Sequence, residues 1–178
     1  MKENPVLRSL CERRSIKSYE ARQISDEALQ AVLQAGACAP SGRGSQSATM
    51  VVVQDADTRA LLSRLNAQVL GNASLDPFYG APTLVVVLGN PEHATWMEDG
   101  CLVMGNLLNA APAVGLGACW IHRAKEVFAM PEGKALLRQW GLSETLVGIA
   151  HCTLGYPAGQ PKPRAPRREG AIVFADRR

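Results

Sequence analysis

Residues 101–123 read Cys-Leu-Val-Met-Gly-Asn-Leu-Leu-Asn-Ala-Ala-Pro-Ala-Val-Gly-Leu-Gly-Ala-Cys-Trp-Ile-His-Arg. The first half is apolar around the whole circumference of a helix, apart from Asn106 and Asn109, so such a helix must be covered by protein or lipid. It is shorter than the roughly 20 apolar residues that a membrane span needs, and it contains Pro112. We therefore predict a buried helix, in a core or at a subunit interface, and no membrane association.

Small residues on this helix favour close contact with another backbone. One stripe combines small and large apolar residues: Gly100, Met104, Leu108 and Ala111. Gly105 adds a second small site, and a symmetric dimer contact would use it naturally. The glycines that follow predict that the helix ends near Val114 and that an extended segment follows over 118–121. A dinucleotide-binding fingerprint needs the opposite order, in which a strand precedes the glycines, so this motif is excluded.

The 178 residues, 47% hydrophobic and 20% charged, predict a single domain with a sizeable core. We expect this domain to end in an extended tail over about 159–178. Met1 leads into a charged segment that does not resemble a signal peptide, so we expect a cytoplasmic protein. The five cysteines contain no Cys-x-x-Cys pair, so neither a disulfide framework nor a metal site is indicated.

The tail is basic, with six Lys or Arg against two acidic residues from Gly159 onward. It could reach a phosphate or a nucleic acid, or it could be a solvated terminus. A second basic feature lies at Arg13-Arg14-Ser15, after a helix predicted over 5–14. Two guanidinium groups and a hydroxyl are the donors that an anionic phosphate accepts.

The remaining pattern alternates helices and strands. We expect helices over 26–37, 57–70, 125–128 and 133–139, and strands over 50–54, 83–88, 146–154 and 171–174. Ser25 caps the first of these helices. Between Ala39 and Ser47 lies a loop rich in glycine and hydroxyl groups, which could lay backbone amides against a ligand. The order of elements leaves a parallel sheet and an antiparallel α+β sheet both open.

Together these motifs resemble the nitroreductase family of FMN flavoproteins, in order and over nearly the whole chain. The motifs that carry the resemblance are Arg13-Arg-Ser, Ala39-Pro-Ser-Gly with Gln46, Asn106, Gly115-Leu-Gly, Leu154-Gly-Tyr-Pro and Lys162-Pro-Arg. The resemblance implies an α+β fold with a central, mostly antiparallel sheet wrapped by helices. It also implies an intertwined homodimer with FMN at the interface.

The resemblance further implies a set of cofactor-binding residues and no catalytic side chain. Arg13 and Ser15 would hold the phosphate and ribityl chain, with Arg14 beside them, and Lys162 and Arg164 would complete the phosphate site. The partner subunit would cover the flavin with one loop, from which Pro40, Ser41, Gly42, Gly44 and Gln46 would contribute. The isoalloxazine ring would lie along Trp120, Ile121, His122 and Arg123, where a backbone amide of His122 or Arg123 would face flavin N5.

The implied activity is a two-step reaction in which NAD(P)H reduces FMN and a small electron-poor acceptor, such as a nitroaromatic or a quinone, then reoxidises it. Three alternatives remain. A non-catalytic FMN-binding or storage protein would use the same contacts. A thiol enzyme would use Cys119 and His122, although an extended segment directs these side chains to opposite faces. A nucleic-acid binder would use the basic tail, but no stacking aromatics accompany it.

Overall fold

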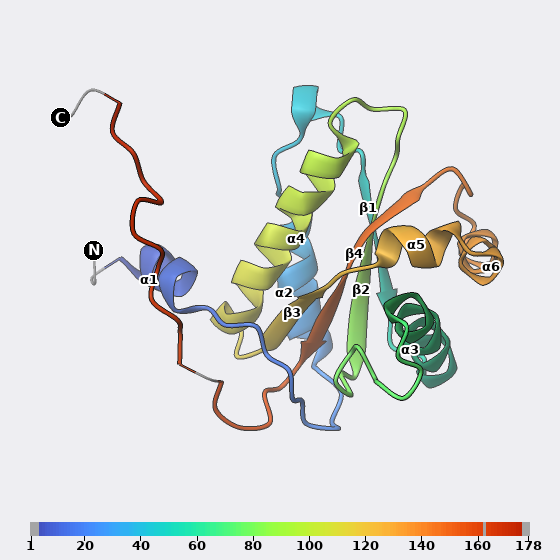
Figure 1. Cartoon of the computed structure of the whole chain (residues 1–178), viewed down its shortest axis with the longest axis horizontal. Coiled ribbons are helices and arrows are strands. Elements are labelled where there is room, and N and C mark those ends of the chain that lie inside the picture. The colour runs from blue at the N-terminus through green and yellow to red at the C-terminus, as the bar shows by residue number, and fades with distance from the viewer. Residues whose placement is uncertain (1–3, 162, 176–178) are drawn as a thin grey trace.

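A four-stranded antiparallel sheet forms the centre of the chain (Figure 1). The computed structural model describes residues 4–161 and 163–175. The strands lie in the order β1-β2-β4-β3, and each pair of neighbours is antiparallel. Their bounds are Ala48–Val53 for β1, Thr83–Gly89 for β2, Gly117–Ile121 for β3 and Val147–Gly155 for β4. The predicted α+β fold with an antiparallel sheet is confirmed, and the parallel alternative is wrong.

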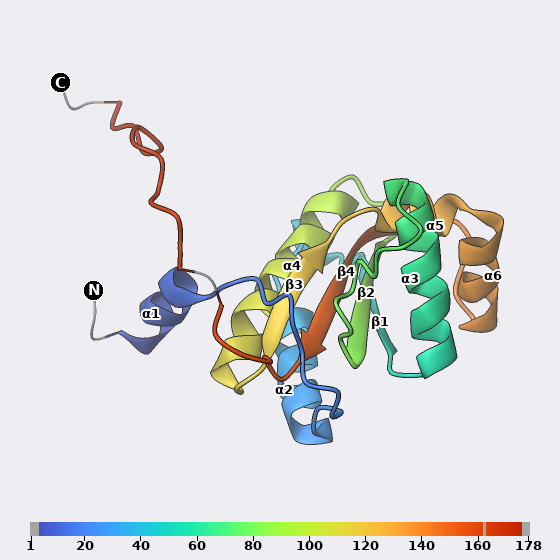
Figure 2. The same ribbon diagram turned by 60° about the horizontal axis from the view of Figure 1, so that its bottom comes forward.

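Helices cover both faces of this sheet (Figures 1 and 2). One hydrophobic cluster joins the sheet to α2 and α4, and a second joins the opposite face to α3, α5 and α6. The helices are α1 (Pro5–Glu12), α2 (Asp26–Ala37), α3 (Ala56–Leu70), α4 (Trp96–Ala113), α5 (Ala124–Ala129) and α6 (Pro131–Gln139), with a short 3-10 turn η1 (Gly42–Gly44). Ser25 caps α2 as predicted, accepting a hydrogen bond from the amide of Ala28.

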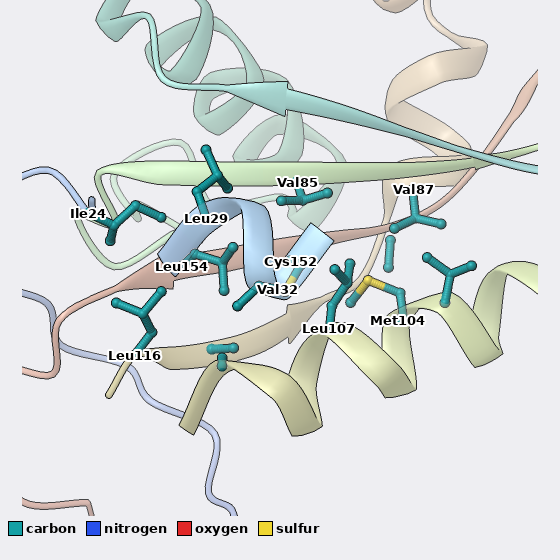
Figure 3. Packing of buried hydrophobic residues seen from close by; sticks show 14 of the residues in the cluster. Ile24, Leu29, Val32, Val85, Val87, Met104, Leu107, Leu116, Cys152 and Leu154 are labelled. Carbon is teal, nitrogen blue, oxygen red and sulfur yellow. The ribbon is translucent and has the colours of Figure 1, made fainter. Parts of the chain in front are cut away.

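All seven residues of β2 are buried, because this strand is central in the sheet and covered on both faces. Val85 and Val87 face the cluster that contains Met104 and Leu107 of α4 (Figure 3). Neighbouring residues of β2 alternate to the other face, where Leu84 belongs to the second cluster. This double coverage accounts for the uninterrupted apolar run of the strand.

Helix α4 is covered on one side only within this chain. Its buried stripe is Gly100, Met104, Leu107 and Ala111. Leu108, predicted in this stripe, is half-buried. On the other side Leu102 is 46% exposed, and no atom of another described element lies within 4 Å of the position that a Cβ at Gly105 would take. The helix ends at Ala113, one residue after Pro112, close to the predicted end.

Helix α1 and the described part of the tail, 163–175, lie on the same side of the sheet (Figures 1 and 2). The apolar face of α1 is open in the single chain, with Val6 66% and Leu10 48% exposed. The predicted strand over 171–174 is wrong, because residues 171 and 172 form a bend and none of the four residues belongs to a strand. Ile172 and Val173 are accordingly 78% and 84% exposed.

Within residues 4–161 and 163–175, none of the helices is both long enough and apolar enough to cross a bilayer.

A fully buried histidine lies in the second cluster. His151 on β4 packs between Phe78 and Phe128, with ring centroids 5.1 and 6.0 Å away. Neither ring nitrogen forms a hydrogen bond of normal geometry to a described residue. Burial lowers the pKa of His151 from 6.5 to about 3, assisted by the charge of Arg123 and opposed by the backbone of Ile121.

This histidine predicts a loss of stability in mild acid. The unfolded chain takes up the proton below pH 6.5 whereas the folded chain resists it down to about pH 3. Between these values the contribution of His151 to the free energy of unfolding should fall by about 1.4 kcal/mol per pH unit. Urea unfolding of the His151→Phe variant and the unaltered protein, measured from pH 7.5 to 4.5, should give free energies whose difference follows this slope. A difference that does not vary with pH would contradict the assignment.

Candidate functional site

The segment after α1 lies along the outer edge of β3. Ser15 forms a parallel bridge with Ala118, and the amide of Ile16 donates to the carbonyl of Ala118 at 3.1 Å. The hydroxyl of Tyr19 donates to the carbonyl of Ile16 at 2.8 Å and shares a hydrogen bond of 2.7 Å with Thr153 of β4. These contacts hold residues 13–19 beside the sheet.

Three cavities follow one another along this segment, with volumes of about 760, 450 and 460 Å³. Arg14 lines the first and the second, and Ser15 and Lys17 line the second and the third. The first lies against α1, and the second lies against the start of the tail at 158–161. The third lies against the end of β3. Because neighbouring cavities share these lining residues, we refer to the three together as the groove, with a basic end at α1 and a sheet end at β3.

The basic end contains a buried cationic nitrogen with no partner. Nη1 of Arg13 is inaccessible to solvent and forms no hydrogen bond within the described residues. Arg8 and Ser9 of α1 line the same cavity. A buried guanidinium N–H without an acceptor is costly, and a phosphate oxygen is the acceptor it favours most.

Two further arginines of the basic end bind backbone carbonyls at or just after the end of α1. Nη1 of Arg14 donates to the carbonyls of Glu12 at 2.6 Å and Arg13 at 2.7 Å. Nη1 of Arg164 donates to the carbonyl of Cys11 at 2.7 Å, so the tail returns to the end of α1. The structure thus brings Arg13, Arg14 and Arg164 together at the end of α1. Lys162 lies outside the described residues.

The sheet end of the groove is formed by the last residues of β3 and the turn after it. Trp120, Ile121, His122 and Arg123 all line the third cavity. Opposite them stands Tyr79, whose ring lies 5.6 Å from Nζ of Lys17. The four residues predicted to lie along a flavin ring are therefore neighbours of Ser15 in one cavity.

The loop after α2 forms a separate site. In Figure 1 it lies near the top, whereas α1 lies at the left. Pro40, Ser41 and Gln46 line a small cavity of about 120 Å³ beside Asp99, and no residue of the loop lines the groove. A single chain therefore does not bring the two predicted groups of residues together.

Asp99 of α4 organises this loop. Its buried carboxylate accepts hydrogen bonds from the Gly42 amide at 2.9 Å, from Ser47 Oγ at 2.6 Å and from Ser45 Oγ at 3.1 Å. The Ser47 hydroxyl and the Gly42 amide lower the pKa of Asp99, so it stays ionised. The loop adopts left-handed backbone angles at non-glycine residues, with φ of 55° at Arg43 and 48° at Gln46. The carboxylate thus offsets the cost of an unfavourable loop conformation.

Lys17 and Asp99 are absent from the residues predicted from the sequence. A signal for Lys17 is present, because side chains two residues apart in an extended segment share a face and Ser15 is among the predicted residues. No signal marked Asp99, because an acidic residue in the first turn of a helix is ordinarily explained by the helix dipole.

The side chains of the thiol alternative do not form a nucleophile and base. Cys119 is 4% exposed, and burial raises the pKa of its thiol, which keeps it protonated. His122 is exposed. Among the described residues no group of three His, Cys, Asp or Glu side chains is arranged to hold a metal ion.

The chain is similar to known proteins in both sequence and fold. Residues 10–156 match the nitroreductase family. One relative is a protein of Archaeoglobus fulgidus whose name, NADH dehydrogenase/NAD(P)H nitroreductase, is itself inferred. It is 32% identical over 162 residues, which are 85% of this chain and 84% of that protein. The NADPH-flavin oxidoreductase of Vibrio harveyi is 29% identical, over 92% of this chain and 71% of that protein.

Among solved structures, the nitroreductase with bound FMN from Bacteroides fragilis superposes with a TM-score of 0.89 at 27% identity, covering 97% of this chain and 100% of that one. The match to the family model covers most of the chain, and the Archaeoglobus relative is matched over most of its own length. The chain therefore belongs to the nitroreductase family.

Proposed function

We propose that this protein is an NAD(P)H-dependent FMN oxidoreductase that passes electrons to a small electron-poor acceptor, such as a nitroaromatic or a quinone. The observation that carries the proposal is the buried, partnerless Nη1 of Arg13 at one end of a groove whose other end is the edge of β3. FMN has a phosphate at one end, which suits the basic end of the groove, and a flat ring at the other, which suits the sheet end.

The residues of the basic end fit the phosphate. Arg13 supplies the free N–H, Ser15 supplies a hydroxyl in the adjoining cavity, and Arg164 is held close by through Cys11. Lys162 would join them from the tail. Binding of the FMN phosphate would also account for the basic tail, since the residues before Gly159 are almost neutral in net charge.

The residues of the sheet end fit the ring. Trp120 and the turn at His122 and Arg123 offer a surface of backbone and apolar atoms beside the Lys17 ammonium. When bound, FMN accepts a hydride from NAD(P)H at N5 and releases electrons to the acceptor. The protein orients the ring, excludes water from one side and directs a backbone N–H of His122 or Arg123 toward N5.

A second copy of the chain completes the site in this proposal. The Pro40–Gln46 loop is anchored away from the groove, so its predicted contact with the flavin requires the groove of a partner. The exposed apolar residues Val6, Leu10 and Leu102, and the open surface at Gly105, provide a face for that partner. The five free cysteines fit the reducing cytoplasm that we propose as its compartment.

Similarity to proteins named for NADPH-flavin oxidoreductase and FMN reductase activity supports turnover over storage of FMN. Purified protein should therefore show oxidised flavin bands that release as FMN, and anaerobic NADPH or NADH should bleach them within seconds. Its molar mass by light scattering should be about twice 19.1 kDa. Menadione or nitrofurazone, added to the bleached protein, should restore the bands.

A yellow protein that neither nucleotide bleaches would support the storage alternative. A protein that stays colourless after incubation with FMN would overturn the proposal.

Arg13 should be needed for FMN affinity. The Arg13→Ala variant should bind FMN at least tenfold more weakly, because a hydrogen bond to a charged group contributes about 1.5–3 kcal/mol. Fluorescence quenching of FMN on titration measures this. Arg138→Ala is the matched control, since Arg138 pairs with Glu144 on the surface far from the groove. Equal affinities for the two variants would remove Arg13 from the phosphate site.

Asp99 should be needed for the order of the loop over the flavin. The Asp99→Ala variant should bind FMN several-fold more weakly and be cleaved faster by protease within 40–47, because the loop loses the acceptor of three hydrogen bonds. Asp55→Ala is the control, since Asp55 likewise accepts from an amide and a hydroxyl, both of Thr58, but at the start of α3. Cleavage of the two variants at the same rate would show that Asp99 does not hold the loop.

A further inference from the structure

A fully buried amide on α3 binds the turn that follows β3. The side chain of Asn66 is 0% exposed. Its Nδ2 donates to the carbonyl of His122 at 2.8 Å, and its Oδ1 accepts from Nε of Arg123 at 3.0 Å. Both ends of one amide are thus used on two consecutive residues that line the groove.

The turn needs this support because its backbone is unfavourable. Arg123 has φ 75° and ψ 10°, the left-handed region that glycine adopts readily and residues with a Cβ avoid. The carbonyl of Arg123 accepts a hydrogen bond from the amide of Val127, which is the first hydrogen bond of α5. Such a conformation persists where its surroundings determine it, and here Asn66 and α5 do so.

The direction of one peptide group follows from the contact with Asn66. A trans peptide is planar, so its C=O and N–H point in opposite directions. When Nδ2 of Asn66 fixes the carbonyl of His122, it also fixes the N–H of Arg123, which points away from Asn66. The hydrogen bond from Nε of Arg123 to Oδ1 of Asn66 holds the same turn through the side chain of Arg123.

We propose that Asn66 is a positioning residue that aims the Arg123 N–H at the flavin and thereby sets the reduction potential of the bound cofactor. This inference rests on the proposed function. An N–H directed at N5 donates to the lone pair of the oxidised ring, and this hydrogen bond is weakened when N5 takes up a hydrogen on reduction, so a well-aligned N–H favours the oxidised form. The side chain of Arg123 then serves as a tether to α3, in addition to contributing charge to the groove.

Asn66→Asp separates the two contacts. The carboxylate keeps an acceptor for Arg123 but removes the donor to the His122 carbonyl. We expect the holoprotein to favour the reduced flavin about tenfold more, a potential higher by about 30 mV for a two-electron couple, because oxidised FMN loses a hydrogen bond at N5. The added negative charge would by itself lower the potential, so a lower potential would overturn the proposal. The matched control is Asn106→Asp, since Nδ2 of Asn106 donates to the carbonyl of Ala35 at 2.8 Å, outside the groove. The control should keep the potential of the unaltered protein.

A measurement on the unaltered protein covers the case in which Asn66→Asp does not fold. In a nitrogen-15 NMR spectrum the Arg123 amide proton should move downfield when FMN is added, and should exchange with solvent more slowly than before. Displacement of that resonance by FMN supports the proposal, and an unmoved Arg123 resonance overturns it.

The outcomes distinguish the inference from the function on which it rests. If the unaltered protein binds no FMN, the proposed function fails before any variant is compared. If the unaltered protein binds and reduces FMN, but folded Asn66→Asp holoprotein has the same potential, the role of Asn66 alone is overturned.

Discussion

Burial of β2 on both faces determines how the other elements are placed. Its seven residues are all covered, so the sheet needs a helical layer on each side, and α2 with α4 form one layer while α3, α5 and α6 form the other. Among the residues that the structure describes, the sheet is then left open at its edges. Along the outer edge of β3, within the described residues, the chain itself pairs only at Ala118. The backbone beyond that point is available to a ligand, and the groove lies there.

Much of this arrangement could be predicted from sequence because it depends on periodic patterns. The apolar run of β2, the cap at Ser25 and the glycines after α4 each act over a few residues, and the structure confirms them. The strand expected at 171–174 shows the limit of such patterns. Its residues have the right composition, but a strand also needs a neighbour, which a local pattern cannot supply.

The site was predictable to the degree that its residues lie in recognisable motifs. The Arg13-Arg14-Ser15 motif and the turn after β3 were found, and one groove joins them. Asn66 and Asp99 were not found, because each acts through contacts more than 50 positions away in the chain. In both cases a buried polar group holds a backbone conformation with positive φ. Neither the strain nor the partner can be read from the neighbouring residues.

The separation of the loop from the groove has a consequence for inheritance. In the proposed dimer, each flavin would lie in the groove of one chain and under the loop of the other. A chain with a defective loop would weaken FMN binding in its partner's groove, while its own groove would stay intact. Two alleles, one damaged at Arg13 and one at Asp99, would then assemble into mixed dimers with one whole site and one doubly damaged site. Such alleles would complement each other within a single oligomer, although each alone is defective.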